Sequence, residues 1–246
     1  MASLALTAVT RRYGAVAALD NVTLAFPDRQ ITAIIGRSGC GKSTLLKLCN
    51  GLEVPDAGTV ELFGRPLDYT NLPRLRRRVG YAVQGTGLFP HLSARDNIAM
   101  LAKLEGWRRP EIAQRVAELA RLCHLQPGQL DQYPHQLSGG QQQRIGLCRA
   151  MMLRPDVLLL DEPFAAIDPV TRLDIHAQLM ELHVNEPTTT VLVTHDMAEA
   201  LRLADLIVIM DAGRIVHSTS RDALLTRGEA TEPERLLLDM LGEIHP

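Results

Sequence analysis

A glycine-rich segment near residue 40 carries the residue types that bind phosphate groups. It fits the pattern G-x-x-x-x-G-K-[ST] and runs on to a threonine, and its members in order are Gly36, Arg37, Ser38, Gly39, Cys40, Gly41, Lys42, Ser43 and Thr44. Glycines allow backbone N–H groups to turn toward phosphate oxygens, and the N-terminus of a following helix adds positive potential. We expect Lys42 to contact the β- and γ-phosphates and Ser43 to ligate Mg²⁺. A simple glycine turn before a helix is the alternative interpretation.

Two neighbouring carboxylates follow an apolar run in the second half of the chain. Residues 157–160 are Val-Leu-Leu-Leu, and Asp161 and Glu162 come directly after them. The carboxyl edge of a sheet is where α/β proteins bind ligands. Asp161 suits Mg²⁺, directly or through water, and Glu162 suits a group that positions or deprotonates an attacking water. Because acidic residues often end strands, this pattern supports a functional site only in combination with the phosphate-binding segment.

A second glycine pair precedes a helical run. Residues 137–141 read Leu-Ser-Gly-Gly-Gln, and residues 142–153 continue with a helical pattern. Ser138 can cap this helix, and the glycines leave its N-terminus able to face a phosphate. A capped helix after an ordinary loop is the plainer alternative.

The surrounding pattern predicts elements that can position these residues. Short apolar runs predict strands at 22–26, 31–35, 79–83, 157–160, 190–194, 206–210 and 214–217. Ser93 and Asp168 are candidate helix caps, and Pro169 suits the first helical position after Asp168. Strands that alternate with helices predict a mainly parallel sheet. The stretch 85–154 predicts a helical insertion.

Composition sets limits on the class of protein. The chain has 246 residues, of which 46% are hydrophobic, enough for one large domain or two closely associated lobes. Its 26 basic and 28 acidic residues nearly balance, so no global basic field points to nucleic acid. No apolar run approaches the roughly 18 residues of a membrane span, and the N-terminal arginines follow an apolar stretch, so no signal peptide is expected. The four cysteines lack C-x-x-C spacing, and reduced thiols are expected.

LSGGQ, the glycine-rich segment and VLLLDEP together resemble the ATP-binding cassette (ABC) family over about residues 2 to 220. The resemblance implies that ATP is also bound by Ser138, Gly139, Gly140 and Gln141. It further implies that Tyr13 stacks on adenine, that Gln84 senses Mg²⁺ and links to a membrane subunit, and that His195 contacts the γ-phosphate. Taken singly, these three residues have plainer interpretations as a core or surface tyrosine, a strand end and a core histidine. The implied catalytic group is Lys42, Gln84, Glu162 and His195, and the implied Mg²⁺ ligands are Ser43, Gln84 and Asp161.

The resemblance also implies a fold and a domain organisation. The fold is α/β, with a P-loop NTPase (RecA-like) core around a mainly parallel sheet, an N-terminal antiparallel β part and an inserted helical subdomain. We expect one ABC ATPase domain, with residues 1–84 and 155–220 in the ATP-binding core and 85–154 in the helical subdomain. Residues 221–246 are expected to form a short helical tail.

Partners follow from the resemblance as well. In the family each ATP lies between the phosphate loop of one subunit and LSGGQ of another, so a second copy of this chain is expected as a homodimer. Integral membrane permease subunits are the expected partners, with a solute-binding protein outside the membrane reached through the permease. The expected location is cytoplasmic, peripheral on the inner face of the plasma membrane, with no nucleic acid partner.

The segment 79–91, with KLEGW and YPHQLSGGQQQR, most resembles ATPases of osmoprotectant importers for glycine betaine, carnitine or choline. Many of these carry paired CBS domains after the cassette. Residues 221–246 are too few for such a pair, so ionic-strength gating through that module is not expected. An exporter ATPase is an open alternative with the same chemistry. A soluble ABC ATPase that acts on nucleic acid or ribosomes is disfavoured by the single cassette and the absence of a basic tail.

Overall fold

A computed structural model of the chain describes residues 3–165 and 167–226. The described residues form two compact units. One contains the residues up to 69 together with those from 191 onward, and the other contains residues 70–190. Of the expected helical tail at 221–246, the described part is α8 (Arg221–Thr226); the remainder lies outside the described residues.

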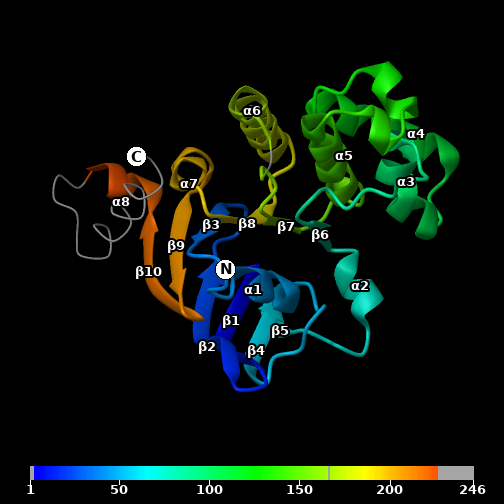
Figure 1. The fold of residues 1–246 in the computed structure, drawn as a ribbon. Coiled ribbons are helices and arrows are strands. Elements are labelled where there is room, and N and C mark those ends of the chain that lie inside the picture. The colour runs from blue at the N-terminus through cyan, green and yellow to red at the C-terminus, as the bar shows by residue number, and fades with distance from the viewer. Residues whose placement is uncertain (1–2, 166, 227–246) are drawn as a thin grey trace. The chain divides into compact units, whose positions relative to one another are not determined.

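The first unit contains a four-stranded antiparallel sheet in the order β2-β1-β4-β5, drawn side by side in Figure 1. Its strands are β1 (Leu4–Tyr13), β2 (Val16–Phe26), β4 (Ala57–Leu62) and β5 (Arg65–Pro66). Along β2, every second residue from Val22 to Phe26 is buried, which is the period of a strand with one solvated face. In β1 the register shifts between Leu6 and Val9, where Ala8 has φ 51°. This bulge returns Val9 to the buried face after Leu4 and Leu6.

The same unit also holds strands of a second sheet. β3 (Ile31–Ile35) pairs in parallel with β9 (Leu206–Asp211), and β10 (Arg214–Ser220) pairs antiparallel with β9. All five residues of β3 are buried, as expected for a continuous apolar run within a parallel arrangement. The helices of this unit are α1 (Lys42–Cys49), α7 (Met197–Leu203) and α8.

In the second unit, β6 (Val79–Ala82) pairs in parallel with β7 (Val157–Asp161). β8 (Thr189–Thr194) contains the point at which the two units divide. Residues 169–185 form the long helix α6 (Pro169–Asn185), with Pro169 at its first position as the sequence predicts. The Asp168 side chain accepts the Thr171 N–H at 3.0 Å and so caps this helix. The short helix α2 (Leu72–Arg76) precedes β6.

The predicted helical stretch forms α3 (Ala94–Leu104), α4 (Arg109–Leu122) and α5 (Gly139–Met151), which gather together in Figure 1. Two short 3₁₀ turns, η1 (Pro127–Asp131) and η2 (Pro134–Gln136), connect α4 to α5. Ser93 caps α3, accepting the Asp96 N–H at 3.1 Å. In α4, Val116 and Leu119 are buried on one face, and Cys123, which continues their helical spacing, lies just beyond the helix. α5 begins three residues earlier than the predicted run.

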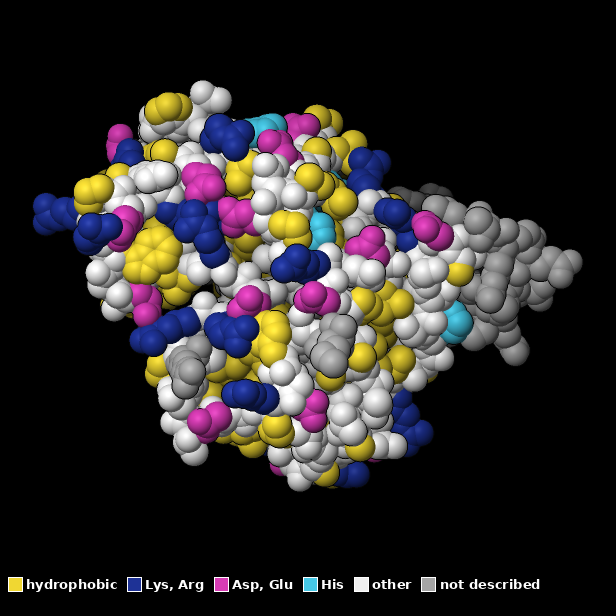
Figure 2. Space-filling view, turned by 180° about the vertical axis from the view of Figure 1, so that it is seen from behind, with side chains coloured by type: hydrophobic (Ala, Val, Ile, Leu, Met, Phe, Trp, Pro, Cys, Tyr) yellow, Lys and Arg dark blue, Asp and Glu magenta, His cyan; other side chains and the backbone are white. Residues whose placement is uncertain are grey.

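The α/β class is confirmed, with an antiparallel N-terminal sheet, mainly parallel strands elsewhere and a helical part. The core and subdomain boundaries expected at 84 and 155 remain predictions. No helix among the described residues is long and apolar enough to span a bilayer. On the face drawn in Figure 2, basic and acidic side chains of the described residues are interspersed rather than segregated by sign.

Candidate functional site

The glycine-rich segment joins the end of β3 to the start of α1, as the sequence predicts. Gly41 occupies the N-cap of α1 with φ 108°, a conformation that L side chains rarely adopt. A Cβ on Gly41 would also meet the Ala18 carbonyl and would lie 2.9 Å from Leu19 Cδ2. Residues 37–39 are exposed, and a Cβ on Gly39 would meet open space. The result is an open loop that leads to a free helix N-terminus, the geometry that receives an anionic group.

Lys42 lies under this loop rather than in solvent. It is buried, and its Nζ donates hydrogen bonds to the carbonyl oxygens of Gly36 at 2.6 Å and Arg37 at 3.0 Å. The Cys40 sulfur lies 3.8 Å from the same nitrogen. A buried ammonium held only by neutral acceptors retains strong attraction for a phosphate placed in the loop. Ser43 is exposed and Thr44 half-buried in the first turn of α1.

Tyr13 and His195 are the other predicted site residues of this first unit. Tyr13 ends β1 with 45% of its surface exposed, and the Arg11 guanidinium lies 5.1 Å from the centre of its ring. His195 follows β8 and is exposed. Thr194 Oγ1 accepts the Asp196 N–H at 3.0 Å and donates to buried Glu199 Oε2 at 2.5 Å. The backbone on both sides of His195 is therefore fixed.

Asp161 ends β7 in the second unit, as predicted. It is 7% exposed, and the Tyr81 hydroxyl of the neighbouring strand lies 3.5 Å from its Oδ2. Burial, followed by the nearby Asp161 charge, raises the pKa of Tyr81 to about 12. Tyr81 therefore stays protonated at neutral pH, and its hydroxyl can serve as a donor to the carboxylate.

Glu162 and Gln84 are brought together in this unit. The Gln84 Nε2 donates a hydrogen bond of 3.0 Å to Glu162 Oε2, which joins residues that follow two neighbouring parallel strands. Glu162 has φ 45°, a left-handed conformation that costs a non-glycine residue about 1–3 kcal/mol. Strained residues of this kind persist only where the surrounding structure holds them in place, and they cluster at functional sites. The geometry aims a half-exposed carboxylate beyond the strand end.

The LSGGQ segment caps α5. Ser138 Oγ accepts the Gln141 N–H at 3.3 Å, and Gln141 Oε1 accepts the Ser138 N–H at 2.9 Å, so the cap is reciprocal. The two glycines have different surroundings. Gly140 is buried, and a Cβ there would collide with Thr171 Cγ2 of α6, whereas one on Gly139 would meet open space. Gly140 therefore permits close packing of α5 against α6, and Gly139 leaves the N-terminus of α5 accessible.

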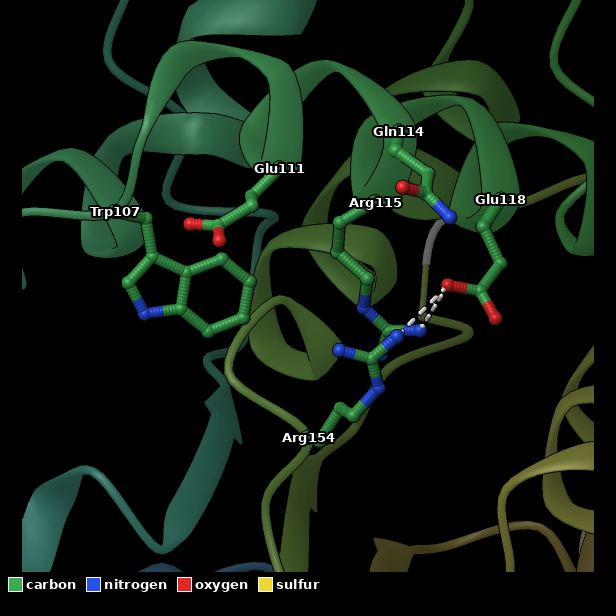
Figure 3. A pocket seen from close by; sticks show the side chains of 6 residues that line it. All are labelled: Trp107, Glu111, Gln114, Arg115, Glu118 and Arg154. Atoms are coloured by element: carbon green, nitrogen blue, oxygen red, sulfur yellow. Dashed lines mark hydrogen bonds and ion pairs between the residues drawn. The ribbon is translucent and has the colours of Figure 1, made fainter.

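A pocket of about 370 Å³ on the helical part of the second unit is shown in Figure 3. Trp107, Glu111, Gln114, Arg115, Glu118 and Arg154 line it. Glu118 Oε2 accepts bonds from Arg115 at 3.0 Å and Arg154 at 3.1 Å, and Glu111 pairs with Arg108. Arg115 also bonds Glu186 and the Met151 carbonyl, so it ties α4 to the ends of α5 and α6. The charged side chains around the pocket neutralise one another, and we assign no ligand to this pocket.

The structure thus places Tyr13, the glycine-rich segment and His195 in one unit, and Gln84, the LSGGQ segment, Asp161 and Glu162 in the other. Sequence reasoning missed Tyr81, Glu199 and Arg149. Arg149 had a signal in the sequence, because it is a charged residue at a position that continues the apolar helical spacing of Ile145, Cys148 and Met152. Its guanidinium is buried and donates to the carbonyl oxygens of Thr86 and Gly87.

Known proteins similar to this chain include three ATP-binding proteins of transport systems. The glycine betaine uptake system ATP-binding protein YehX of Escherichia coli (strain K12) is 45% identical over 219 residues, 89% of this chain and 71% of the relative. The choline transport ATP-binding protein OpuBA of Bacillus subtilis (strain 168) is 42% identical over 223 residues, 90% of this chain and 58% of the relative. The sulfate/thiosulfate import ATP-binding protein CysA of Mycobacterium tuberculosis (strain ATCC 25618 / H37Rv) is 47% identical over 206 residues, 84% of this chain and 58% of the relative.

Solved structures agree with these relatives. The dimeric post-hydrolysis state of the ATP-binding cassette MJ0796, bound to ADP and Pi, has a TM-score of 0.80 and 30% identity, and covers 92% of this chain and 100% of its own. The structure of cbiO1 from Clostridium perfringens has a TM-score of 0.85 and 26% identity, and covers 99% and 98% of the two chains. The family model described as ABC transporter matches residues 19–165, more than half of the chain. This chain therefore belongs to the ABC transporter family, as an ATPase built on the P-loop NTPase fold.

Proposed function

We propose that this chain hydrolyses ATP as a homodimer to drive import of an osmoprotectant, a quaternary amine such as glycine betaine or choline, through a membrane permease. The similarity to two ATP-binding proteins named for these solutes, across about nine tenths of the chain, carries the proposal. Sulfate or thiosulfate import is the second candidate, because CysA is 47% identical. Both candidates share the direction of transport.

Nucleotide binding is assigned to the first unit. The loop from Gly36 to Thr44 receives the phosphates, with backbone N–H groups at the start of α1 as donors. Lys42 exchanges its carbonyl partners for the β- and γ-phosphates, and the exposed ring of Tyr13 stacks on the adenine. His195, at the end of a braced strand, contacts the γ-phosphate.

Mg²⁺ is the implied cofactor, and the oxygen donors of the predicted set suit it. No group of three or more His, Cys, Asp or Glu in the described part of the chain could hold a metal by itself. Mg²⁺ does not need such a cage, since it is usually bound by one or two carboxylates, phosphates and water. Ser43, Asp161 and the Gln84 carbonyl oxygen would hold it; the Gln84 amide nitrogen is bonded to Glu162 and leaves Oε1 for a cation. When bound, Mg²⁺ neutralises charge on the phosphates.

Glu162 is the residue to which we assign activation of the attacking water. Its carboxylate is half-exposed, and Gln84 orients it by a direct hydrogen bond. A carboxylate in this position can accept a proton from water as the water attacks the γ-phosphate. ADP and inorganic phosphate are then the products.

A second copy of the chain completes each site. Exposed Ser138 and Gly139 lie at the N-terminus of α5, and this helix end faces the γ-phosphate bound by the partner copy. The similar cassette MJ0796 has been solved as a dimer in two structures, which supports this arrangement. Because the chain carries both halves of the chemistry, two identical copies make two equivalent sites.

The segment from Gln84 to His91 is the proposed relay to the permease. Gln84 reports on the nucleotide at one end, and Phe89 is 40% exposed near the other. Asn97, fully buried at the start of α3, fixes the segment: it accepts the Phe89 N–H at 2.8 Å and donates to the carbonyl oxygens of Phe89 and Leu92. A helix of the membrane subunit can dock against the side chains that this scaffold presents.

Transport by the reconstituted complex tests the proposal. The chain is purified with its membrane partner, placed in proteoliposomes with the binding protein, and assayed for ATP-driven uptake of labelled glycine betaine, choline and sulfate, with Glu162→Gln as the inactive control. Uptake of either quaternary amine is the expected result. Uptake of sulfate alone would support the second candidate, and ATP-driven movement in the opposite direction would identify an exporter. Recovery of no membrane partner, with ATPase activity stimulated by nucleic acid or ribosomes, would overturn the proposal.

A further inference from the structure

Arg149 is a buried charged residue with an unusual set of partners. Only 8% of its surface is exposed, and its guanidinium donates to two backbone carbonyls, through Nη1 to Gly87 at 2.8 Å and through Nη2 to Thr86 at 2.9 Å. No carboxylate among the described residues bonds to it, and burial lowers its pKa. Burial of a charge without a counter-ion is unfavourable, so Arg149 contributes something other than simple core packing.

The two acceptors belong to a strained turn. Gly85, Thr86 and Gly87 have φ values of 74°, 64° and 54°, and the Gly87 N–H bonds back to the Gly85 carbonyl at 2.7 Å. Positive φ is a true outlier for a β-branched residue such as Thr86. A Cβ on Gly87 would lie 2.6 Å from Val83 Cγ2, so the position needs glycine for space as well as conformation. An external partner must hold such a turn, and the fork of Arg149 matches its two adjacent carbonyls.

This turn directly follows Gln84, and Arg149 stands on the same helix as Ser138. The Gln84 side-chain amide donates a hydrogen bond of 3.0 Å to Glu162. Because the turn begins at the residue after Gln84, its conformation helps to set the direction of the Gln84 side chain. Gly146 lies one turn before Arg149 on α5, where a Cβ would meet the Thr86 carbonyl at 3.6 Å. The helix α5, which begins at the LSGGQ segment, therefore carries on one surface the contacts that shape the loop of Gln84.

We infer that Arg149 is a positioning residue for hydrolysis: it clamps the Thr86–Gly87 turn onto α5 and so keeps Gln84 aimed at Glu162. Through this clamp, a displacement of α5 is transmitted to Gln84 without any contact between Ser138 and Gln84. The inference rests on the proposed role of Gln84 in the hydrolytic site.

A double-mutant cycle between Arg149→Lys and Gln84→Ala tests the inference. Lysine keeps the charge but, as a single point donor, it cannot reproduce the fork. Because misplacement of a catalytic group by about 1 Å can cost roughly 10²-fold, we expect a kcat loss of about tenfold in Arg149→Lys, with little change in KM for ATP. The loss should vanish in the Gln84→Ala background, because the clamp acts only through Gln84. Multiplicative losses in the double variant would overturn the inference.

Arg115→Lys is the matched control, since Arg115 is also a buried guanidinium bonded to backbone carbonyls in the same unit. Its hydrogen-bond partners are Met151, Met152, Glu118 and Glu186 rather than the turn, so its effect on kcat should be the same with or without Gln84. Arg149→Gln is a second variant at this position, in case Arg149→Lys does not fold. Thermal unfolding measures whether each variant is folded. If neither variant folds, Arg149 has a structural role and the inference fails. If Gln84→Ala alone leaves kcat unchanged, the proposed role of Gln84 fails instead, which separates the two outcomes.

Discussion

The side-chain amide of Gln84 donates a hydrogen bond of 3.0 Å to Glu162 Oε2, although the two residues are 78 positions apart in the chain. β6 and β7 pair in parallel, so residues that follow their carboxyl ends meet at one edge of the sheet. The contact links the residue proposed to sense Mg²⁺ with the residue proposed to activate water. It therefore gives a structural basis for coupling nucleotide state to hydrolysis.

Glu162→Gln should abolish most hydrolysis and spare nucleotide binding. The amide cannot accept a proton from the attacking water, and general-base catalysis contributes about 10²–10⁴-fold, so a loss of at least about 10²-fold in kcat is expected. ATP affinity and ATP-driven dimerisation should persist, which fluorescent-nucleotide titration and size-exclusion chromatography can measure. Unchanged turnover would remove Glu162 from this role.

Lys42→Ala should weaken ATP binding, in contrast to Glu162→Gln, which should spare it. The ammonium lies beneath the loop on the carbonyl oxygens of Gly36 and Arg37, and its deletion removes a charge aimed at the phosphates. We expect weakened ATP binding, measured by the same titration, while Glu162→Gln serves as the variant with intact binding. Equal affinities in the two variants would contradict the assignment.

Cys40 should be the most reactive of the four cysteines. All four are free and buried. Burial raises the pKa of Cys49 and Cys148, which lowers their reactivity, whereas the Cys40 sulfur lies in the phosphate loop, 3.8 Å from the Lys42 ammonium. Alkylation followed by peptide mass spectrometry should label Cys40 first, and bound ATP should slow the reaction. Cys40→Ser controls for labelling elsewhere; identical Cys40 rates with and without ATP would argue against the proposed loop geometry.

Glu199→Leu should destabilise the segment around His195. It leaves the Thr194 hydroxyl without its acceptor in a buried site, and an unsatisfied buried group costs about 1–3 kcal/mol. Denaturant unfolding should show this loss, and kcat should fall as His195 loses its support. Glu199→Gln retains an acceptor oxygen and is the matched control. Equal stability of Glu199→Leu and the native chain would show that this brace is dispensable.

A charged residue in place of Leu88 or Phe89 should uncouple the transporter. Phe89 is exposed while its backbone is held by Asn97, so a charge there alters the docking surface more than the fold. Basal ATPase activity of the isolated chain should be retained, and solute-stimulated hydrolysis and uptake should be lost in proteoliposomes. Full stimulation in Phe89→Glu would exclude this segment as the relay.

The sequence by itself determined the chemistry and much of the local structure. The strand into the phosphate loop, the caps at Ser93, Ser138 and Asp168, and the carboxylates at the end of β7 depend on neighbouring residues, and the structure has each in place. Such features are set by short-range sterics, capping and hydrophobic period, which a single sequence displays.

Only the tertiary structure decided which distant residues meet. The left-handed conformation of Thr86 contradicts its local preference, and Arg149, more than sixty residues away, supplies the bonds that hold it. The close approach of Gly140 to Thr171 and the brace between Thr194 and Glu199 likewise arise from packing. Contacts of this kind are chosen by the compact fold as a whole, because a buried polar group must find whichever partner the packed elements bring within reach.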